Sequence, residues 1–221
     1  LEFINTLITL FNNRDKNLVF VGADPLNGIA GCVAKRLGLV DFAIVYSVDY
    51  AEQRFENSVL NFFYHFIDKT AVKCLDEVWA VSSRITALRR TQGVPDYKNF
   101  QIPNSCFFDQ VPRRSYEDID PHKLVIVSTI SKATDFRPVI DALEELSKEI
   151  SDIHLDFIGD GNSKSDLVQY VASRGITTRV NFLGFLSHED VYKVLAGAGA
   201  GIAPYTGRAP WSYYCDPMKI H

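Results

Sequence analysis

Two glycines and a carboxylate stand together where one short apolar run ends. Gly159-Asp160-Gly161 follows Leu155-Asp156-Phe157-Ile158 and precedes a helical pattern. Glycines in such a turn let the backbone approach a phosphate closely, and the N-terminus of the next helix presents free N–H donors. The sequence lacks the third glycine of the dinucleotide-binding fingerprint and the Gly-Lys-Ser/Thr of a P-loop. The segment is therefore either a phosphate-binding turn or an ordinary tight turn.

A second candidate phosphate site lies near the end of the chain. Asp216-Pro217-Met218-Lys219-Ile220 has the pattern of a helix start, with Asp216 as N-cap and Pro217 in the first position. The backbone amides around Asp216 to Met218 would face the anion. Because the Asp216 carboxylate would repel a phosphate, these amides would have to outweigh it.

Three carboxylates could supply acid or base groups to one site. Asp24, Asp49 and Asp160 each follow a short apolar run of strand type, so they could converge on a cleft. Asp49 is our candidate for a catalytic role. Aspartates are also common turn formers in such loops. The sequence contains no Ser-His-Asp order, His-Glu-x-x-His pair or EF-hand pattern that would suggest another chemistry.

These residues lie in a regular alternation of short apolar runs and helical patterns. The runs cover 124–129, 155–158, 180–184 and 201–204, with helices of about ten residues between them. This alternation predicts βα units and a parallel sheet. Ligands of such sheets bind beyond the carboxyl ends of the strands. Ser128, Thr129 and the Gly159–Gly161 turn would lie at those ends.

The first half of the chain follows a similar plan, which predicts an α/β protein with two Rossmann-like domains. Strands are expected over 18–22, 42–47, 77–81 and 100–102, with helices around them. Periodicity is then lost and Pro, Arg, Asp and Glu accumulate over 105–121, which we interpret as a linker. The expected domains are 1–104 and 122–221.

The helix expected over 57–75 carries an aromatic stripe on one face, formed by Val59, Phe62/Phe63, Phe66/Ile67, Ala71 and Cys74/Leu75. Such a stripe could contact a lipid acceptor or a membrane surface. We favour burial in the core, because no Lys/Arg-rich opposite face accompanies it. His65 in the same helix is interpreted as a structural histidine.

Composition excludes some classes of protein. The 221 residues carry a formal net charge of -4, so there is no global basic field that would attract nucleic acid. Four widely spaced cysteines without a Cys-x-x-Cys pair favour reduced thiols in the cytoplasm over disulfides or a zinc site. The chain starts without Met inside a helical pattern and stops just after the start of another helical pattern. We therefore expect a fragment truncated at both ends.

Several strings, in their order and spacing, carry a resemblance to a known family. They are Leu124-Val-Ile-Val-Ser-Thr, Ile158-Gly-Asp-Gly, Arg179-Val-Asn-Phe-Leu-Gly-Phe-Leu-Ser, Gly201-Ile-Ala-Pro-Tyr and Asp216-Pro-Met-Lys-Ile, preceded by Ala71-Val-Lys-Cys-Leu-Asp-Glu-Val-Trp-Ala-Val-Ser, Gly93-Val and Ile102-Pro-Asn. The sequence resembles retaining glycosyltransferases of family four, also called glycosyl transferases group one, which have the GT-B fold.

The resemblance implies two Rossmann-like domains that face each other across a cleft. The second would bind a nucleotide-sugar donor and the first a sugar, lipid or glycan acceptor, and the sugar would be transferred with retention of configuration. No metal or other cofactor is expected. The donor-binding residues implied by the resemblance and the loop positions are Ser128, Thr129, Lys132, Gly159, Asp160, Gly161, Phe182, Asp216, Pro217 and Met218.

The sequence departs from the family pattern at several positions. The basic pair that usually neutralises the diphosphate is replaced by Thr129 and Thr134, so Lys132 or Arg137 would have to substitute. A frequent His is replaced by Val48, next to Asp49. These departures leave a non-catalytic binding or scaffold module of the same fold as the alternative. A sugar-nucleotide epimerase is a weaker third candidate.

Truncation has two expected consequences. The chain alone should fold but not catalyse transfer, because retaining transfer requires groups from both domains. Its exposed sheet edges should favour pairing with another copy. Peripheral contact with a membrane is a further expectation.

Overall fold

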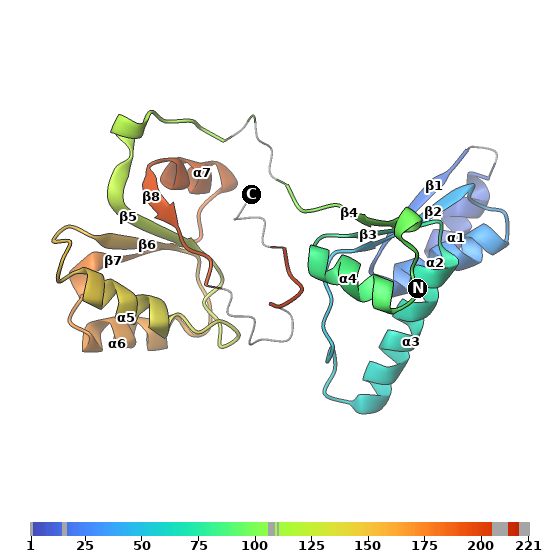
Figure 1. Ribbon diagram of the computed structural model, residues 1–221, viewed down its shortest axis with the longest axis horizontal. Coiled ribbons are helices and arrows are strands. Elements are labelled where there is room, and N and C mark those ends of the chain that lie inside the picture. Colours follow the sequence, from blue (N-terminus) through green and yellow to red (C-terminus); the bar gives the residue numbers. More distant parts are fainter. Residues whose placement is uncertain (1, 15–16, 106–108, 110, 205–211, 217–221) are drawn as a thin grey trace. The chain divides into compact units, whose positions relative to one another are not determined.

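The computed structural model describes residues 2–14, 17–105, 109, 111–204 and 212–216, and it confirms an α/β protein built from two Rossmann-like bodies (Figure 1). The first unit contains the chain up to Asn104 together with residues 212–216. The second contains the described residues from Ser105 to 204. Each has its own parallel four-stranded sheet and its own apolar core, and each is described by itself below.

The sheet of the first unit runs in chain order. Its strands are β1 (Val19–Ala23), β2 (Phe42–Ser47), β3 (Glu77–Ala80) and β4 (Asn99–Gln101), all parallel and ordered β1-β2-β3-β4. In the register Ala23 pairs with Tyr46, and Ser47 pairs with Ala80. The residues that follow these strands therefore meet at one edge of the sheet, which includes Asp24 and Asp49.

The described residues of the first unit form four α-helices. They are α1 (Glu2–Asn12), α2 (Asp24–Arg36), α3 (Ser58–Cys74) and α4 (Ser83–Thr91). The Asn57 side chain caps α3 by accepting hydrogen bonds from the first-turn amides, and Ser82 caps α4 in the same way. The helix expected over 57–75 is thus confirmed as α3.

The stripe of α3 is only partly in the core: Ala71 and Leu75 are buried as we expected, but our interpretation was wrong for the aromatic residues. Phe62, Phe63 and Phe66 are 65%, 55% and 59% exposed. The helix buries residues only from Asp68 onward, where it crosses α2. A Cβ at Gly28 would lie 2.8 Å from the Ala71 side chain, so the two helices touch there. Before this crossing, Asn61, Tyr64 and His65 contact the loop of residues 50–55, and the aromatic residues of the stripe remain exposed.

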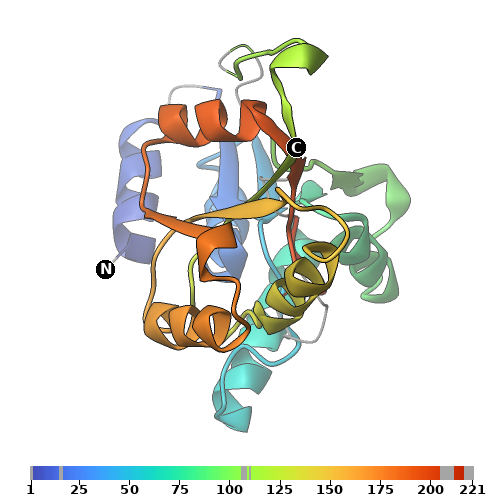
Figure 2. The ribbon, with the colours of Figure 1, turned by 90° about the vertical axis from the view of Figure 1, so that its left-hand side faces the viewer.

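The sheet of the second unit has the order β7-β6-β5-β8, again all parallel. Its strands are β5 (Asp120–Val127), β6 (His154–Ile158), β7 (Val180–Gly184) and β8 (Ala198–Gly201), and its helices are α5 (Arg137–Leu146), α6 (Lys164–Ser173) and α7 (His188–Ala196). Figure 2 shows α5 and α6 on one face of this sheet and α7 on the other.

The last strand differs from its prediction. β8 begins at Ala198, three residues before the predicted run at 201–204. A Cβ at Gly199 would lie 2.4 Å from the Pro121 carbonyl oxygen, so only glycine allows this pairing with β5. The strand consists of glycine and alanine because larger side chains would not fit where the backbones of β8 and β5 approach each other.

The N-terminal stretch of the first unit ends at Asn104, and the segment interpreted as a linker contains regular structure. β5 begins at Asp120, inside the segment interpreted as a linker, and a short 3-10 turn at Tyr116–Asp118 precedes it. Residues 212–216, expected in the second domain, group with the first unit. None of the helices among the described residues is long and apolar enough to span a membrane.

Candidate functional site

Gly159 and Gly161 lie where the loop after β6 packs against the loop after β5. Gly159 has a φ of 129°, and a Cβ there would lie 2.0 Å from the Ser128 carbonyl oxygen. A Cβ at Gly161 would lie 2.1 Å from the Ile130 carbonyl oxygen. Any side chain would push the two backbones apart. Close packing of the loops is thus the first reason for both glycines.

Backbone hydrogen bonds extend this packing to a third loop. The Ser128 N–H donates to the Ile158 carbonyl at 3.0 Å. The Ile130 N–H donates to the Asp160 carbonyl at 3.0 Å, and the Gly159 N–H donates to the Gly184 carbonyl at 2.7 Å. The carboxyl ends of β5, β6 and β7 therefore form one continuous edge.

The loop after β5 presents unused hydrogen-bond donors at this edge. Among the described residues, no protein acceptor receives the N–H of Thr129, Ser131 or Lys132. The Lys132 ammonium also makes no ion pair or hydrogen bond within the described part of the chain. Backbone N–H groups without a protein partner need water or a ligand. Together with the lysine they can bind an anion.

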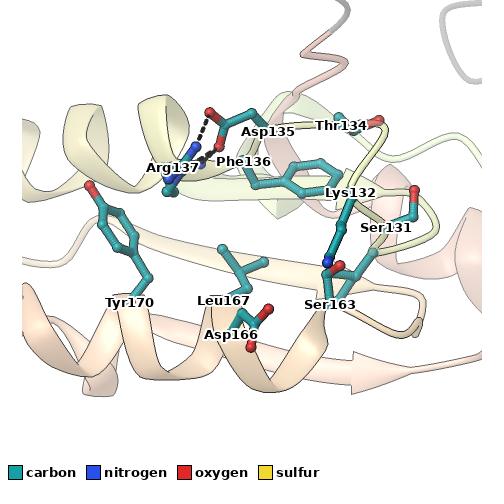
Figure 3. Close-up of a pocket in the computed structure, with 11 residues that line it drawn as sticks. Ser131, Lys132, Thr134, Asp135, Phe136, Arg137, Ser163, Asp166, Leu167 and Tyr170 are labelled. Carbon is teal, nitrogen blue, oxygen red and sulfur yellow. Dashed lines mark hydrogen bonds and ion pairs between the residues drawn. The ribbon is translucent and has the colours of Figure 1, made fainter.

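A pocket of about 420 Å³ opens beside this loop, between the first turns of α5 and α6 (Figure 3). The lining residues are Ile130, Ser131, Lys132, Thr134, Asp135, Phe136, Arg137, Ser163, Asp166, Leu167 and Tyr170. Phe136 and Leu167 are buried and form its apolar floor. The Lys132 side chain extends toward Ser163 in the close-up. Of the predicted donor-binding residues, Lys132 lines this pocket.

The pocket's other cation is already paired. Arg137 makes two hydrogen bonds of 2.8 Å to the Asp135 carboxylate, from Nε and Nη2. Its backbone N–H donates to the same carboxylate at 3.1 Å. Of the two residues expected to replace the family's basic pair, Arg137 is thus engaged and Lys132 is not.

Asp160 has a cationic neighbour that we did not identify from the sequence. Lys164 Nζ lies 2.8 Å from Asp160 Oδ2, and the Gly161 N–H donates to Oδ1 at 2.8 Å. These two contacts hold the pKa of Asp160 below its usual value. The spacing of four residues could have revealed the pair. Lys164 offsets a negative charge that would otherwise repel a phosphate.

Phe182 does not present an open ring to solvent. It is half-buried in β7 and stacks on Phe157, with 5.8 Å between ring centroids and 24° between planes. Phe185, which follows Gly184, is 78% exposed. Gly184 has a φ of 69°, so the chain turns sharply there. An exposed aromatic after a strand-ending glycine is the signal that could have singled out Phe185.

Asp49 lies at the carboxyl edge of the first unit's sheet, beside an arginine. Arg54 Nη1 lies 2.7 Å from Asp49 Oδ2. Asp49 Oδ1 is buried and has no hydrogen-bond partner among the described residues. A buried carboxylate oxygen is costly without a donor. This oxygen is therefore an acceptor that lacks a donor in the described part of the chain.

The loop that carries Arg54 is fastened to α3. Asn61 Oδ1 accepts from the Arg54 N–H at 2.8 Å, and Asn61 Nδ2 donates to the Glu52 carbonyl at 3.1 Å. His65 Nε2 lies 2.8 Å from the same carbonyl. The predicted structural histidine thus holds this loop in place.

Asp216 is engaged within the first unit. Its carboxylate accepts the Asn104 N–H and its carbonyl accepts from Asn104 Nδ2, both at 2.7 Å. Pro217 and Met218, the rest of the second candidate phosphate site, lie outside the described residues. Within the described ranges, no group of three or more His, Cys, Asp or Glu residues is arranged to hold a metal ion.

Comparison with known proteins found one family model and several solved structures that this chain resembles. The family model described as Glycosyl transferases group 1 matches residues 108–207. No sequence among curated proteins matches significantly. Solved glycosyltransferase structures match in fold, and the chain spans a little over half the length of the HepE structures among them.

Three of these structures illustrate the likeness. A complex of HepE from Anabaena with UDP has a TM-score of 0.69 at 16% identity, over 87% of this chain and 54% of that one. The lipopolysaccharide outer core galactosyltransferase WaaB in its apo form gives 0.57 at 17%, over 88% and 52%. Pneumococcal O-GlcNAc transferase GtfA with UDP and GlcNAc gives 0.56 at 15%, over 82% and 37%. At these identities the likeness concerns the fold.

Proposed function

We propose that this chain is part of a cytoplasmic glycosyltransferase that moves a sugar from a nucleotide-sugar donor to an acceptor with retention of configuration. The observation that carries the proposal is the set of unused donors on one loop of the second unit. They are the N–H groups of Thr129, Ser131 and Lys132 and the Lys132 ammonium. This loop lies inside the segment that matches the glycosyltransferase family.

The donors suit the chemistry of the leaving group. Breaking the bond between the sugar and the diphosphate builds negative charge on phosphate oxygens while the sugar becomes oxocarbenium-like. Preorganised N–H groups and an ammonium stabilise that charge. The Lys132 ammonium would take the place of the family's basic pair, and no metal or cofactor would be required. The negative charge of Asp160 does not cancel the positive potential of these donors, because the Lys164 ammonium lies 2.8 Å from the Asp160 carboxylate.

The loop after β7 would contact the base of the nucleotide. Phe185 is 78% exposed and follows Gly184, whose carbonyl is hydrogen-bonded to the glycine turn. An exposed ring at this edge offers an apolar face on which a base can stack. UDP is the first nucleotide to test, since the HepE and GtfA structures contain it.

The first unit would hold the acceptor, a sugar, lipid or glycan. Asp49 Oδ1 is buried without a donor, and Arg54 fixes the other carboxylate oxygen at 2.7 Å. Asp49 would accept a hydrogen bond from the attacking hydroxyl and so orient it. For the 221 residues alone we expect donor binding without transfer. Transfer requires catalytic groups from both domains, positioned within about 0.5 Å.

A non-catalytic binding module of the same fold is the alternative. It is favoured by the neutral side chains of Thr129 and Thr134 and by the engagement of Arg137 with Asp135. Both functions predict nucleotide binding. Turnover of a nucleotide sugar by a longer protein that contains this chain, abolished by Asp49→Asn, would exclude the binding module.

Titration calorimetry with UDP, GDP and ADP tests the donor site directly. We expect one of these nucleotides to bind, and Lys132→Ala to weaken binding about tenfold, the loss of one charged hydrogen bond. Lys148→Ala is the matched control, because Lys148 is exposed and pairs with Glu145 at 2.6 Å. Absence of binding by all three nucleotides, or equal effects of both variants, would contradict the proposed donor site.

A further inference from the structure

Five large apolar side chains are exposed together on the first turns of α3. Val59, Leu60, Phe62, Phe63 and Phe66 are 60%, 55%, 65%, 55% and 59% exposed. We call these five residues the apolar tip. From Asn57 to Ile67 the sequence contains no Asp, Glu, Lys or Arg. Contiguous exposed apolar surface of this kind marks an interaction site.

The apolar tip stands clear of the rest of the first unit. The buried residues of α3 are Asp68, Ala71 and Val72, all beyond the tip. Figure 1 shows this half of α3 extending past the end of α2, with only the preceding loop beside it. The exposed rings therefore occupy a convex projection.

This projection is held in a defined shape. Asn61 accepts a hydrogen bond from the Arg54 N–H at 2.8 Å and donates to the Glu52 carbonyl at 3.1 Å. Phe55 packs edge-on against Tyr64, with 5.8 Å between ring centroids. These contacts hold the backbone that carries the exposed rings against the preceding loop.

Two lysines lie on the same face of α3 as the rings. Phe62, Phe66, Lys69 and Lys73 are spaced four, three and four residues apart, which places them along one line of a helix. Both lysines are exposed, and neither ammonium makes an ion pair or hydrogen bond with a described residue. The nearest acid on the helix, Asp68, is buried and paired with Arg89. The face thus changes from aromatic to cationic along its length.

We propose that the apolar tip inserts into the surface of a membrane containing anionic phospholipid. The rings would enter the boundary between headgroups and acyl chains, where amphipathic helices bind. Lys69 and Lys73 would reach lipid phosphates, and a lysine near an anionic leaflet contributes roughly 1 kcal/mol. The proposal does not depend on the donor site, since these residues belong to the first unit.

The size of the tip argues against a second copy as its partner. Five half-exposed side chains offer roughly 500 Å² of apolar surface, below the roughly 800 Å² per partner of a stable protein interface. A convex tip also presents no matching hollow to another copy of itself. A lipid surface adapts to this shape.

Vesicle sedimentation tests the proposal with the 221-residue chain. We expect it to bind phosphatidylcholine vesicles that contain phosphatidylglycerol, and to bind pure phosphatidylcholine more weakly. The double variant Phe62→Ser/Phe66→Ser should reduce binding about tenfold or more, given about 1.5 kcal/mol or more for each buried aromatic side chain. Lys69→Glu/Lys73→Glu should abolish the preference for anionic vesicles.

The matched control is Ile4→Ser/Ile8→Ser on α1, where the two side chains are 60% and 52% exposed. It should bind vesicles like the parent chain. Circular dichroism and urea midpoints should show that all variants are folded, since every mutated side chain is exposed. Absence of binding to anionic vesicles would overturn the proposal. So would a parent dimer that the Phe62→Ser/Phe66→Ser variant turns into a monomer, because the tip would then be a protein interface.

Discussion

Asn104 and Asp216, 112 residues apart in the chain, are joined by two hydrogen bonds of 2.7 Å. One connects the Asn104 N–H to the Asp216 carboxylate, and the other connects the Asn104 amide to the Asp216 carbonyl. The same segment is fixed by Tyr214, whose hydroxyl donates to Glu52 at 2.9 Å and whose carbonyl accepts from Ser82 at 2.8 Å. A stretch far along the sequence thus completes the first unit.

Replacing Asn104 should loosen this stretch. Asn104→Ala removes the bond to the Asp216 carbonyl, worth about 1 kcal/mol, so amides of residues 212–216 should exchange hydrogen about fivefold faster. Hydrogen-exchange mass spectrometry measures this. Asn162→Ala, at an exposed site in the second unit, is the control and should leave these amides unchanged. Equal exchange in all three proteins would show that the bond does not hold the segment.

A buried ion pair between α3 and α4 should dominate the stability of the first unit. The side chains of Arg89 and Asp68 are each 2% exposed and form a bidentate ion pair. Asp68→Ala would leave the guanidinium charge buried, at a cost of about 3–5 kcal/mol. Urea unfolding should show this loss.

The adjacent residue supplies the control for that experiment. Arg90 pairs with Asp96 at 2.5 Å, but the two side chains are 57% and 75% exposed. Arg90→Ala should therefore change the free energy of unfolding by less than about 1 kcal/mol. If both variants lost the same stability, burial of the Arg89–Asp68 pair would not be the cause.

Gly161→Ala should disturb the loops at the carboxyl edge of the second sheet. The new Cβ would lie 2.1 Å from the Ile130 carbonyl oxygen, so the loop after β5 must move. Nucleotide binding measured by calorimetry should fall about tenfold or more, since ligands are held by groups fixed within about 0.5 Å. Gly201→Ala meets nothing within 4 Å and should bind like the parent chain. Unaltered binding by Gly161→Ala would place the nucleotide elsewhere.

Asp156 should make the second unit less stable in acid. Burial by itself would raise the pKa of Asp156, but hydrogen bonds from Lys123 at 2.8 Å and Asn181 at 2.9 Å outweigh it and hold the pKa below its usual value of 3.8. A carboxyl whose pKa is lowered by folding stabilises the protein above its unfolded pKa. That stability is lost as the pH falls through the folded pKa.

Urea unfolding of Asp156→Asn at several pH values tests whether stability is lost as the pH falls. The difference in stability between the parent and the variant should be largest near about pH 7 and should shrink below about pH 4, as the carboxyl becomes protonated. Asp109→Asn, at an exposed site, should follow the parent at every pH. A difference that is constant with pH would mean that the charge of Asp156 does not contribute.

Much of the fold could be predicted from the chain itself, since local signals agree with the structure. β2 occupies the predicted residues 42–47, and β7 occupies 180–184. Ser187 caps α7 by accepting the N–H of Asp190, three residues further along the chain. These features depend on neighbours a few residues apart, which the sequence shows directly.

The features that were predicted wrongly or left open depend on contacts between residues far apart in the chain. The apolar residues of α3 have helical spacing whether or not another element covers them, so spacing could not show that Phe62 and Phe66 are exposed. The pattern Asp216-Pro217 fits an N-cap, but nothing in it reveals that Asn104 holds the carboxylate. Lys132 and Arg137 are equal candidates in the sequence, and only the ion pair with Asp135 distinguishes them.

The sequence by itself therefore determined the alternation of strands and helices, the parallel sheets and the loops at their carboxyl ends, because hydrophobic period and capping are local properties. Tertiary structure alone decided which donors are unused on the loop after β5 and why Gly159 and Gly161 must be glycine. It also decided which face of α3 meets solvent. Each of these depends on atoms brought within a few ångströms by the packing of segments that are far apart in the chain.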